Sequence, residues 1–138
     1  MNERPHELAA LVLRLALGTM YLSHALWKIF TLSMPVTVDF FVAQGFPGWT
    51  AYAVVAAELT GGVLLIAGVQ VRAVAILLIP ILLGALKVHL PNGFVFSYPN
   101  GGWEYVAFLI VTSAVQALLG EGAYALDRAV GRTRLAHA

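Results

Sequence analysis

Four long apolar segments constrain this chain more than any other feature, because together they make up more than half of its 138 residues. They cover residues 8–30, 50–70, 73–90 and 103–120 and are 18 to 23 residues long. A helix needs about 20 residues, within roughly 17–25, to cross a bilayer. A helix also satisfies its own backbone hydrogen bonds in lipid, which an isolated strand cannot do. The sequence therefore predicts an all-α integral membrane protein, a four-helix bundle that forms one transmembrane domain over residues 1–138.

The composition supports a lipid bilayer as the main partner. Hydrophobic residues make up 60% of the chain and charged residues only 11%, whereas soluble domains carry about 25% charged residues. The formal net charge is +1, so no basic surface indicates a nucleic-acid partner. The chain has no cysteine, which excludes disulfides, CxxC redox motifs and thiolate metal sites.

Two of the apolar segments carry features that modify a plain spanning helix. The first segment is too long for the core of a signal peptide and contains Arg14, His24 and Lys28, so we expect it to be retained. The third contains Pro80, which cannot donate a backbone hydrogen bond to Ile76. We therefore expect a kink in the third helix.

The connection over residues 31–49 is apolar and aromatic, unlike an ordinary linker. Pro35 is placed to begin a short helix, and Gly45 and Pro47 are placed to end it. This pattern predicts a helix over Val36–Ala43 that lies along the outer membrane interface or folds back over the bundle. An irregular loop is the alternative.

The basic residues between the apolar segments are distributed on one side only. Residues 31–49 and 91–102 contain no lysine or arginine. The other connections and the chain ends contain Arg4, Arg72, Arg128, Arg132 and Arg134. The positive-inside rule therefore predicts that both termini and the Arg72 link lie in the cytoplasm.

Six ionisable side chains lie in the outer half of the predicted helices. At about 1.5 Å per residue, His24 and Glu58 lie roughly 9–12 Å below the outer boundary. Lys28, Lys87, His89 and Glu104 are shallower. A charge at the centre of a lone spanning helix costs about 2.5–3.5 kcal/mol, so we expect these groups to pair inside the bundle.

We predict that these groups form a ligand-binding site with nearby polar and aromatic residues. Its floor is expected at His24 and Glu58, with Glu58 close to His24 or Lys28. Lys87 and Glu104 are expected to meet across the mouth. The predicted ligand-binding residues are His24, Lys28, Glu58, Lys87, His89, Asn92, Trp103, Glu104 and Tyr105.

The alternative for the shallow residues is a structural one, because they could reach the interface and serve only as anchors. Arg14 is expected to be structural, either extending to the interface or forming an ion pair with Asp127. No catalytic residue is assigned.

Three kinds of ligand were considered for this site. Haem is disfavoured, because His24 and His89 are offset by about 7 Å along the bundle axis. No close-spaced pair such as HxxxH or ExxH indicates a metal site. The head group of a quinone-like molecule fits the mixture of donors, acceptors and aromatic residues near the membrane surface.

Several motifs in order along the chain resemble the DoxX family of small bacterial membrane proteins. They are LRLALGTMYLSHALWKIF, GFPGW, AELTGGVLLIAG, KVHLPNGF, GGWEY and YALDR. The resemblance implies four transmembrane helices in the bacterial inner membrane. The residues carried over from it are Arg14, His24, Lys28, Glu58, Gly62, Arg72, His89, Asn92, Gly93, Gly102, Glu104 and Asp127.

The resemblance also implies a function associated with quinones or redox stress, often as an accessory subunit with a redox protein partner. Distant relatives act as cargo receptors or assembly chaperones. A non-catalytic assembly or interaction subunit therefore stays open as an alternative, as does a carrier of a small solute or proton. Gly61, Gly62 and Gly68 allow close helix approach, either within the bundle or in a homodimer.

Overall fold

The computed structural model describes residues 4–130, and this part of the chain is helical, with no strand. The prediction of an all-α protein is confirmed for these residues. The elements, in chain order, are α1 (Arg4–Trp27), the π-helix η1 (Lys28–Leu32), α2 (Met34–Ala43), α3 (Trp49–Ala67), α4 (Val71–His89), the 3-10 helix η2 (Leu90–Asn92) and α5 (Glu104–Leu119), followed by a short helical turn over residues 126–130.

Three helical stretches are long and apolar enough to cross a membrane. They are Arg4–Leu32, Trp49–Ala67 and Val71–Asn92. The remaining candidate, α5, is apolar but has only 16 residues. At about 1.5 Å per residue it is about 24 Å long, somewhat less than the roughly 30 Å of a hydrocarbon core. Arg132 and Arg134, which contributed to the predicted topology, lie outside the described residues.

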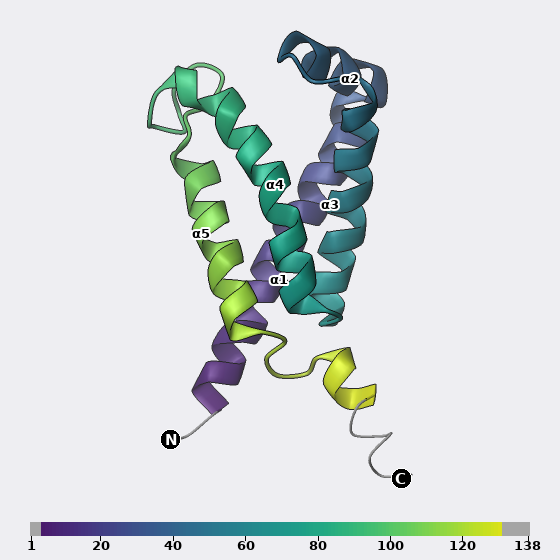
Figure 1. Ribbon diagram of the computed structural model, residues 1–138, viewed down its shortest axis with the longest axis vertical. Coiled ribbons are helices and arrows are strands. Elements are labelled where there is room, and N and C mark those ends of the chain that lie inside the picture. The colour runs from purple at the N-terminus through teal and green to yellow at the C-terminus, as the bar shows by residue number, and fades with distance from the viewer. Residues whose placement is uncertain (1–3, 131–138) are drawn as a thin grey trace.

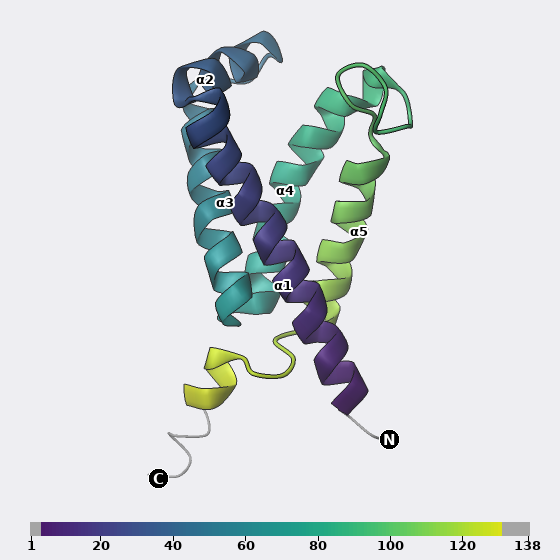
Figure 2. The ribbon, with the colours of Figure 1, turned by 180° about the vertical axis from the view of Figure 1, so that it is seen from behind.

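The long helices form two pairs, α1 with α3 and α4 with α5. The pairs lie close together where the Arg72 link joins α3 to α4, and they spread apart toward the end that carries α2 (Figure 1). The view from behind shows the same divergence, with the described chain ends near the link (Figure 2). We call these two ends of the bundle the Arg72 end and the α2 end.

The close pairing of α1 with α3 depends on two glycines. A Cβ atom placed on Gly62 would lie 2.9 Å from the carbonyl oxygen of Gly18 and 2.9 Å from the backbone nitrogen of Leu22. A Cβ on Gly18 would lie 2.8 Å from the carbonyl oxygen of Gly62. Side chains at these positions would force the two helices apart. Gly62 therefore packs within the bundle, one of the two uses predicted for it.

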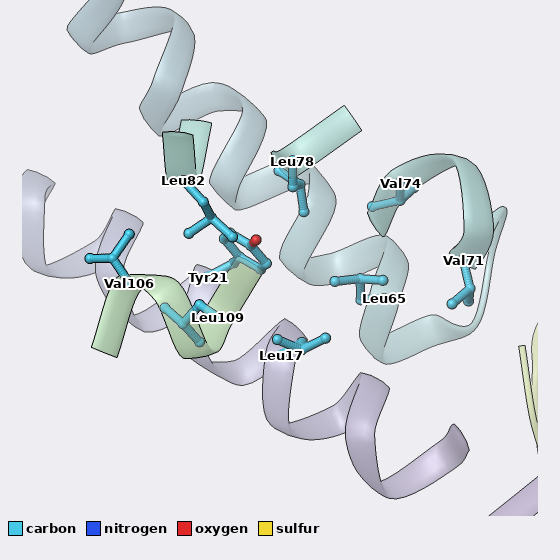
Figure 3. Close-up of a cluster of buried hydrophobic side chains, with 9 residues drawn as sticks. All are labelled: Leu17, Tyr21, Leu65, Val71, Val74, Leu78, Leu82, Val106 and Leu109. Atoms are coloured by element: carbon cyan, nitrogen blue, oxygen red, sulfur yellow. The ribbon is translucent and has the colours of Figure 1, made fainter. Parts of the chain in front are cut away.

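The hydrophobic core joins the two pairs (Figure 3). It is built from side chains of α1, α3, α4 and α5 that are almost fully shielded from solvent. Its buried members are Leu17, Tyr21, Leu65, Val71, Val74, Leu78, Leu82, Val106 and Leu109.

The helix α2 lies across the end of the α1–α3 pair (Figure 1). Pro35 stands in its first turn, where a missing backbone N–H costs nothing. The buried hydroxyl of Thr37 donates to the carbonyl oxygens of Ser33 and Lys28, at 2.9 and 3.3 Å, and so ties α2 to η1. The helix α4 runs through Pro80 without interruption.

Candidate functional site

A cavity of about 910 Å³ opens at the α2 end, with walls from both helix pairs and from α2. Most of its wall is apolar or aromatic, which is typical of small-molecule sites with a few orienting polar groups. The polar and amphipathic residues in the wall are Tyr21, His24, Trp27, Lys28, Thr37, Gln44, Thr50, Glu58, His89 and Tyr105.

An ion pair between Lys28 and Glu58 lies in the cavity wall. The Nζ atom of Lys28 donates to both carboxylate oxygens of Glu58, at 2.9 and 2.7 Å. The two side chains are only 16% and 7% exposed, respectively. Lys28 was one of two expected neighbours of Glu58, and the structure brings these two together. A charge-assisted contact of this kind connects α1 and η1 to α3 and neutralises both charges.

The placement of Lys28 depends on a local irregularity that the sequence analysis missed. Lys28 is the first residue of the π-helix η1, which ends at Ser33 with a φ of +73°. Single turns of π-helix alter the direction of side chains and are common at functional sites. The residues KIFTL carry no sequence signal that separates this turn from an ordinary α-helix.

His24 is held in one orientation by contacts on both sides of its ring. Its Nδ1 atom lies 2.9 Å from the carbonyl oxygen of Met20. Because a carbonyl only accepts, Nδ1 carries the hydrogen, and Nε2 of the neutral ring is an acceptor. The ring stacks on Tyr105 of α5, with centroids 6.4 Å apart. His24 and Tyr105 therefore link the two helix pairs across the cavity.

His89 reaches the same cavity from the end of α4. Its Nδ1 atom lies 3.0 Å from the carbonyl oxygen of Gly101, which also accepts a hydrogen bond from the amide of Asn92. By the same argument as for His24, Nε2 of the neutral His89 ring is an acceptor.

The other four residues predicted to bind ligand do not line the cavity, and the expected contact between Lys87 and Glu104 is not formed. Nζ of Lys87 lies 5.2 Å from the centre of the Phe46 ring. Glu104 accepts a hydrogen bond from the backbone N–H of Phe96 instead. The predicted contact between Lys87 and Glu104 was wrong because the loop over residues 93–103 folds back on the start of α5. A backbone N–H of this loop then binds the Glu104 carboxylate.

Asn92 and Trp103 also serve this loop. The amide of Asn92 donates to the carbonyl oxygens of Asn100 and Gly101. The ring of Trp103 packs edge-on against Phe94, with centroids 4.9 Å apart. The described structure gives both residues contacts that shape the α4–α5 connection rather than the cavity wall.

Arg14 does not pair with Asp127, contrary to one of the two expectations for it. Its guanidinium donates to four backbone carbonyl oxygens and is 1% exposed. The acceptors belong to Glu121, Leu65, Ile66 and Ala123. Asp127 instead accepts from the backbone N–H of Gln70, at 2.8 Å. The structural role expected for Arg14 fits these contacts, but with main-chain partners.

The segment over residues 31–49 also supplies cavity residues that were not predicted from the sequence. Thr37, Gln44 and Phe46 all line the cavity. Polar side chains in an otherwise apolar segment that folds over a bundle were the only available signal. Within residues 4–130, no group of three or more His, Asp or Glu side chains is placed to hold a metal ion.

No solved structure matches the chain. A curated relative from Bacillus subtilis (strain 168), named "Putative oxidoreductase CatD", is 36% identical over 122 residues, which is 88% of this chain and 86% of the relative. The family model described as DoxX matches residues 9–91. The chain therefore belongs to the DoxX family.

Proposed function

We propose that this protein is a membrane subunit associated with redox chemistry, and that its cavity binds the head group of a quinone-like molecule. One observation carries the proposal: a shielded Lys28–Glu58 ion pair faces a large cavity whose wall is mostly apolar and aromatic. The oxidoreductase named among its relatives supports a redox role. The electrons come from a redox protein partner, and no catalytic residue is assigned to this chain.

The cavity chemistry suits a ring that carries carbonyl oxygens. A lysine ammonium has three donor hydrogens, and Glu58 occupies two directions around Nζ of Lys28. The third hydrogen can be donated to a ligand carbonyl. The Nε2 atoms of His24 and His89 can accept from a ligand hydroxyl. The aromatic and aliphatic wall accommodates the ring and the start of an isoprenoid tail. When bound, such a ligand supplies coupled electron and proton chemistry.

Binding can be tested with a short-chain benzoquinone and the purified protein in mild detergent. Trp27 lines the cavity, so its fluorescence should be quenched on binding. Glu58→Gln keeps the size of the side chain but removes its charge, and we expect retained folding and about tenfold weaker binding. Glu104→Gln is the matched control, because this carboxylate lies outside the cavity wall.

Equal binding by wild type, Glu58→Gln and Glu104→Gln would contradict the proposed site. Mass spectrometry of lipids that co-purify with the wild-type protein provides an independent check. An isoprenoid quinone should be retained by the wild type and lost from Glu58→Gln.

A non-catalytic assembly subunit is the second candidate, favoured by the direct contact between α1, η1 and α3 that Lys28 and Glu58 make. If the ion pair only holds helices together, an apolar pair should replace it. The double variant Lys28→Met with Glu58→Leu would then protect cells against quinone stress as well as the wild type. Under the quinone proposal this variant folds but does not protect. A carrier would be revealed by solute uptake into vesicles.

The proposed location is the bacterial inner membrane, with one four-helix transmembrane domain over residues 1–138 and both termini in the cytoplasm. Arg72 and the basic residues near the chain ends support this orientation. Reporter fusions at Gly45 and Asn92 should report the periplasm, and a fusion at the C-terminus the cytoplasm. A cytoplasmic signal at Asn92 would overturn it. A homodimer is tested by native mass spectrometry, where monomer alone would exclude it.

A further inference from the structure

A buried amide oxygen lies between the cavity and the Arg72 end. Gln116 of α5 is 0% exposed, and its Nε2 atom donates to the carbonyl oxygen of Gly120 at 2.8 Å. Its Oε1 atom has no hydrogen-bond partner among the described residues. Exchanging the oxygen and nitrogen of the Gln116 amide does not solve this, because the amide oxygen would then face the carbonyl oxygen of Gly120. A buried amide oxygen without a donor costs about 1–3 kcal/mol.

A pair of hydroxyls lies one turn away on the same face of α5. The buried residues of this helix are Val106, Leu109, Ser113 and Gln116, which follow helical spacing along one face. The hydroxyls of Ser113 and Tyr21 lie 3.3 Å apart and are also buried. Two hydroxyls supply two hydrogens, and their mutual bond uses one. One donor hydrogen therefore remains on the buried helix face that also carries the unpaired amide oxygen of Gln116.

We propose that a water molecule binds between the Tyr21–Ser113 pair and Oε1 of Gln116. A water that accepts the remaining hydroxyl hydrogen and donates to Oε1 satisfies both groups. Buried waters in proteins typically occupy such positions, bridging polar groups that lack direct partners. The site holds water rather than a metal, because its ligands are neutral and it contains no carboxylate or imidazole.

This water extends the polar wall of the cavity toward the opposite end of the bundle. Tyr21 itself lines the cavity. At the other end, Gln116 reaches Gly120, and the guanidinium of the exposed Arg72 donates to the carbonyl oxygen of Ala117 nearby. The resulting column of polar groups continues from the cavity toward the Arg72 end. The water site does not depend on the proposed function.

The chain has no cysteine, so single cysteine substitutions can report water access without interference. Ser113→Cys is close in size to the native residue. In proteoliposomes, silver ions should consume this thiol about tenfold faster than the thiol of Ala114→Cys, because thiols react as thiolates in contact with water. Ala114 is the matched control, since it is the next residue of α5 and is exposed on the outside of the bundle. Equal rates for the two variants would overturn the proposal.

Gln116→Leu tests whether this amide holds the water. Added to Ser113→Cys, it should slow the reaction with silver ions about tenfold, because the replaced side chain no longer offers an acceptor. An unchanged rate would show that Gln116 holds no water and would also overturn the proposal.

A second measurement uses the unsubstituted serine, in case Ser113→Cys does not fold. Radiolytic hydroxyl-radical labelling should oxidise Tyr21 although its side chain is 1% exposed, because bound water generates radicals in place. The Gln116→Leu variant should lower this labelling about threefold. No decrease would contradict the water site, since any labelling would then come from the cavity alone.

The two proposals can fail separately. Silver access to Ser113→Cys requires no quinone, and quinone binding in the Glu58→Gln comparison requires no water at Gln116. Rapid reaction of Ser113→Cys with silver ions, without quinone binding, would support the water site and contradict the quinone proposal. Quinone binding together with equal rates of reaction with silver ions for Ser113→Cys and Ala114→Cys would support the quinone site and contradict the water site.

Discussion

The two ends of this bundle carry buried charge in different ways. At the Arg72 end, the Arg14 guanidinium gives its hydrogens to four carbonyl oxygens in a closely packed region. At the α2 end, Lys28 and Glu58 neutralise each other beside a cavity of about 910 Å³. The first arrangement directs the guanidinium to main-chain acceptors and leaves Arg14 only 1% exposed. The second leaves donor capacity facing open volume, and this difference separates a structural charge from a candidate site.

Two glycines, Gly68 and Gly84, differ in the space around them. At the Arg72 end, Gly68 lies against Ala125 and the guanidinium of Arg14, within 3.1 Å of a Cβ built at its position. Gly84, in the cavity wall, has as its nearest such neighbour the ring of Phe46 at 3.9 Å. The chain is therefore more closely packed at Gly68 than at Gly84.

Removing Arg14 should have the largest effect. Arg14→Leu removes four hydrogen bonds to carbonyl oxygens, and hydrogen bonds from charged groups contribute about 1.5–3 kcal/mol each. We expect the free energy of unfolding in mild detergent to fall by about 4 kcal/mol or more. Arg72→Leu is the control, because this arginine is exposed and makes one hydrogen bond, of 3.4 Å, among the described residues, and should cost about 0.5 kcal/mol. Similar losses of unfolding free energy for Arg14→Leu and Arg72→Leu would contradict the structural role of the buried Arg14 guanidinium.

Breaking the Lys28–Glu58 pair should cost less and should be reversible by a second substitution. Lys28→Met leaves the Glu58 carboxylate without its partner, and we expect a loss of about 3 kcal/mol in the same measurement. The further change Glu58→Leu should restore most of this stability, because an apolar pair needs no hydrogen bonds. No second side-chain substitution should rescue Arg14→Leu, whose partners are main-chain atoms. A double variant as unstable as Lys28→Met would contradict this.

Two Gly→Ala substitutions compare the packed and the open regions directly. Gly62→Ala places a methyl group 2.9 Å from backbone atoms of α1 and should cost about 2 kcal/mol by forcing α1 and α3 apart. Gly84→Ala has space and should stabilise α4 by about 0.5 kcal/mol through better helix propensity. Thermal unfolding measures both. If Gly62→Ala is neutral, the glycine contact does not set the distance between these helices.

The smallest effect is expected at Lys87, which the sequence placed at the mouth of the site. Its ammonium lies over the Phe46 ring, a cation–π contact that contributes about 0.5–1 kcal/mol. Lys87→Met should therefore cost about 0.5 kcal/mol and leave benzoquinone binding unchanged. A large loss of binding would support the predicted ligand-binding role of Lys87 and would contradict its position outside the binding site.

The sequence predicted the helical class, the apolar segments and the depth of their polar groups. It could do so because the helical rise per residue is fixed and the apolar pattern is local. The expected neighbours of Glu58 were His24 or Lys28, and Lys28 is its partner. Depth was not enough for Lys87 and Glu104, which lie at matching depth but turn to Phe46 and to the backbone N–H of Phe96. The direction of a side chain around its helix axis depends on neighbouring segments.

The sequence itself determined that the chain forms apolar helices long enough to cross a membrane. It also determined which ionisable groups lie within the apolar segments and which glycines permit close approach of two helices. The tertiary structure alone decided what each charge contacts. The acceptors of Arg14 are carbonyl oxygens, which every residue carries, so no pattern of side chains could mark them. The π-helix at Lys28 and the fold of α2 over the bundle shape the cavity, and both depend on packing between segments that the sequence presents separately.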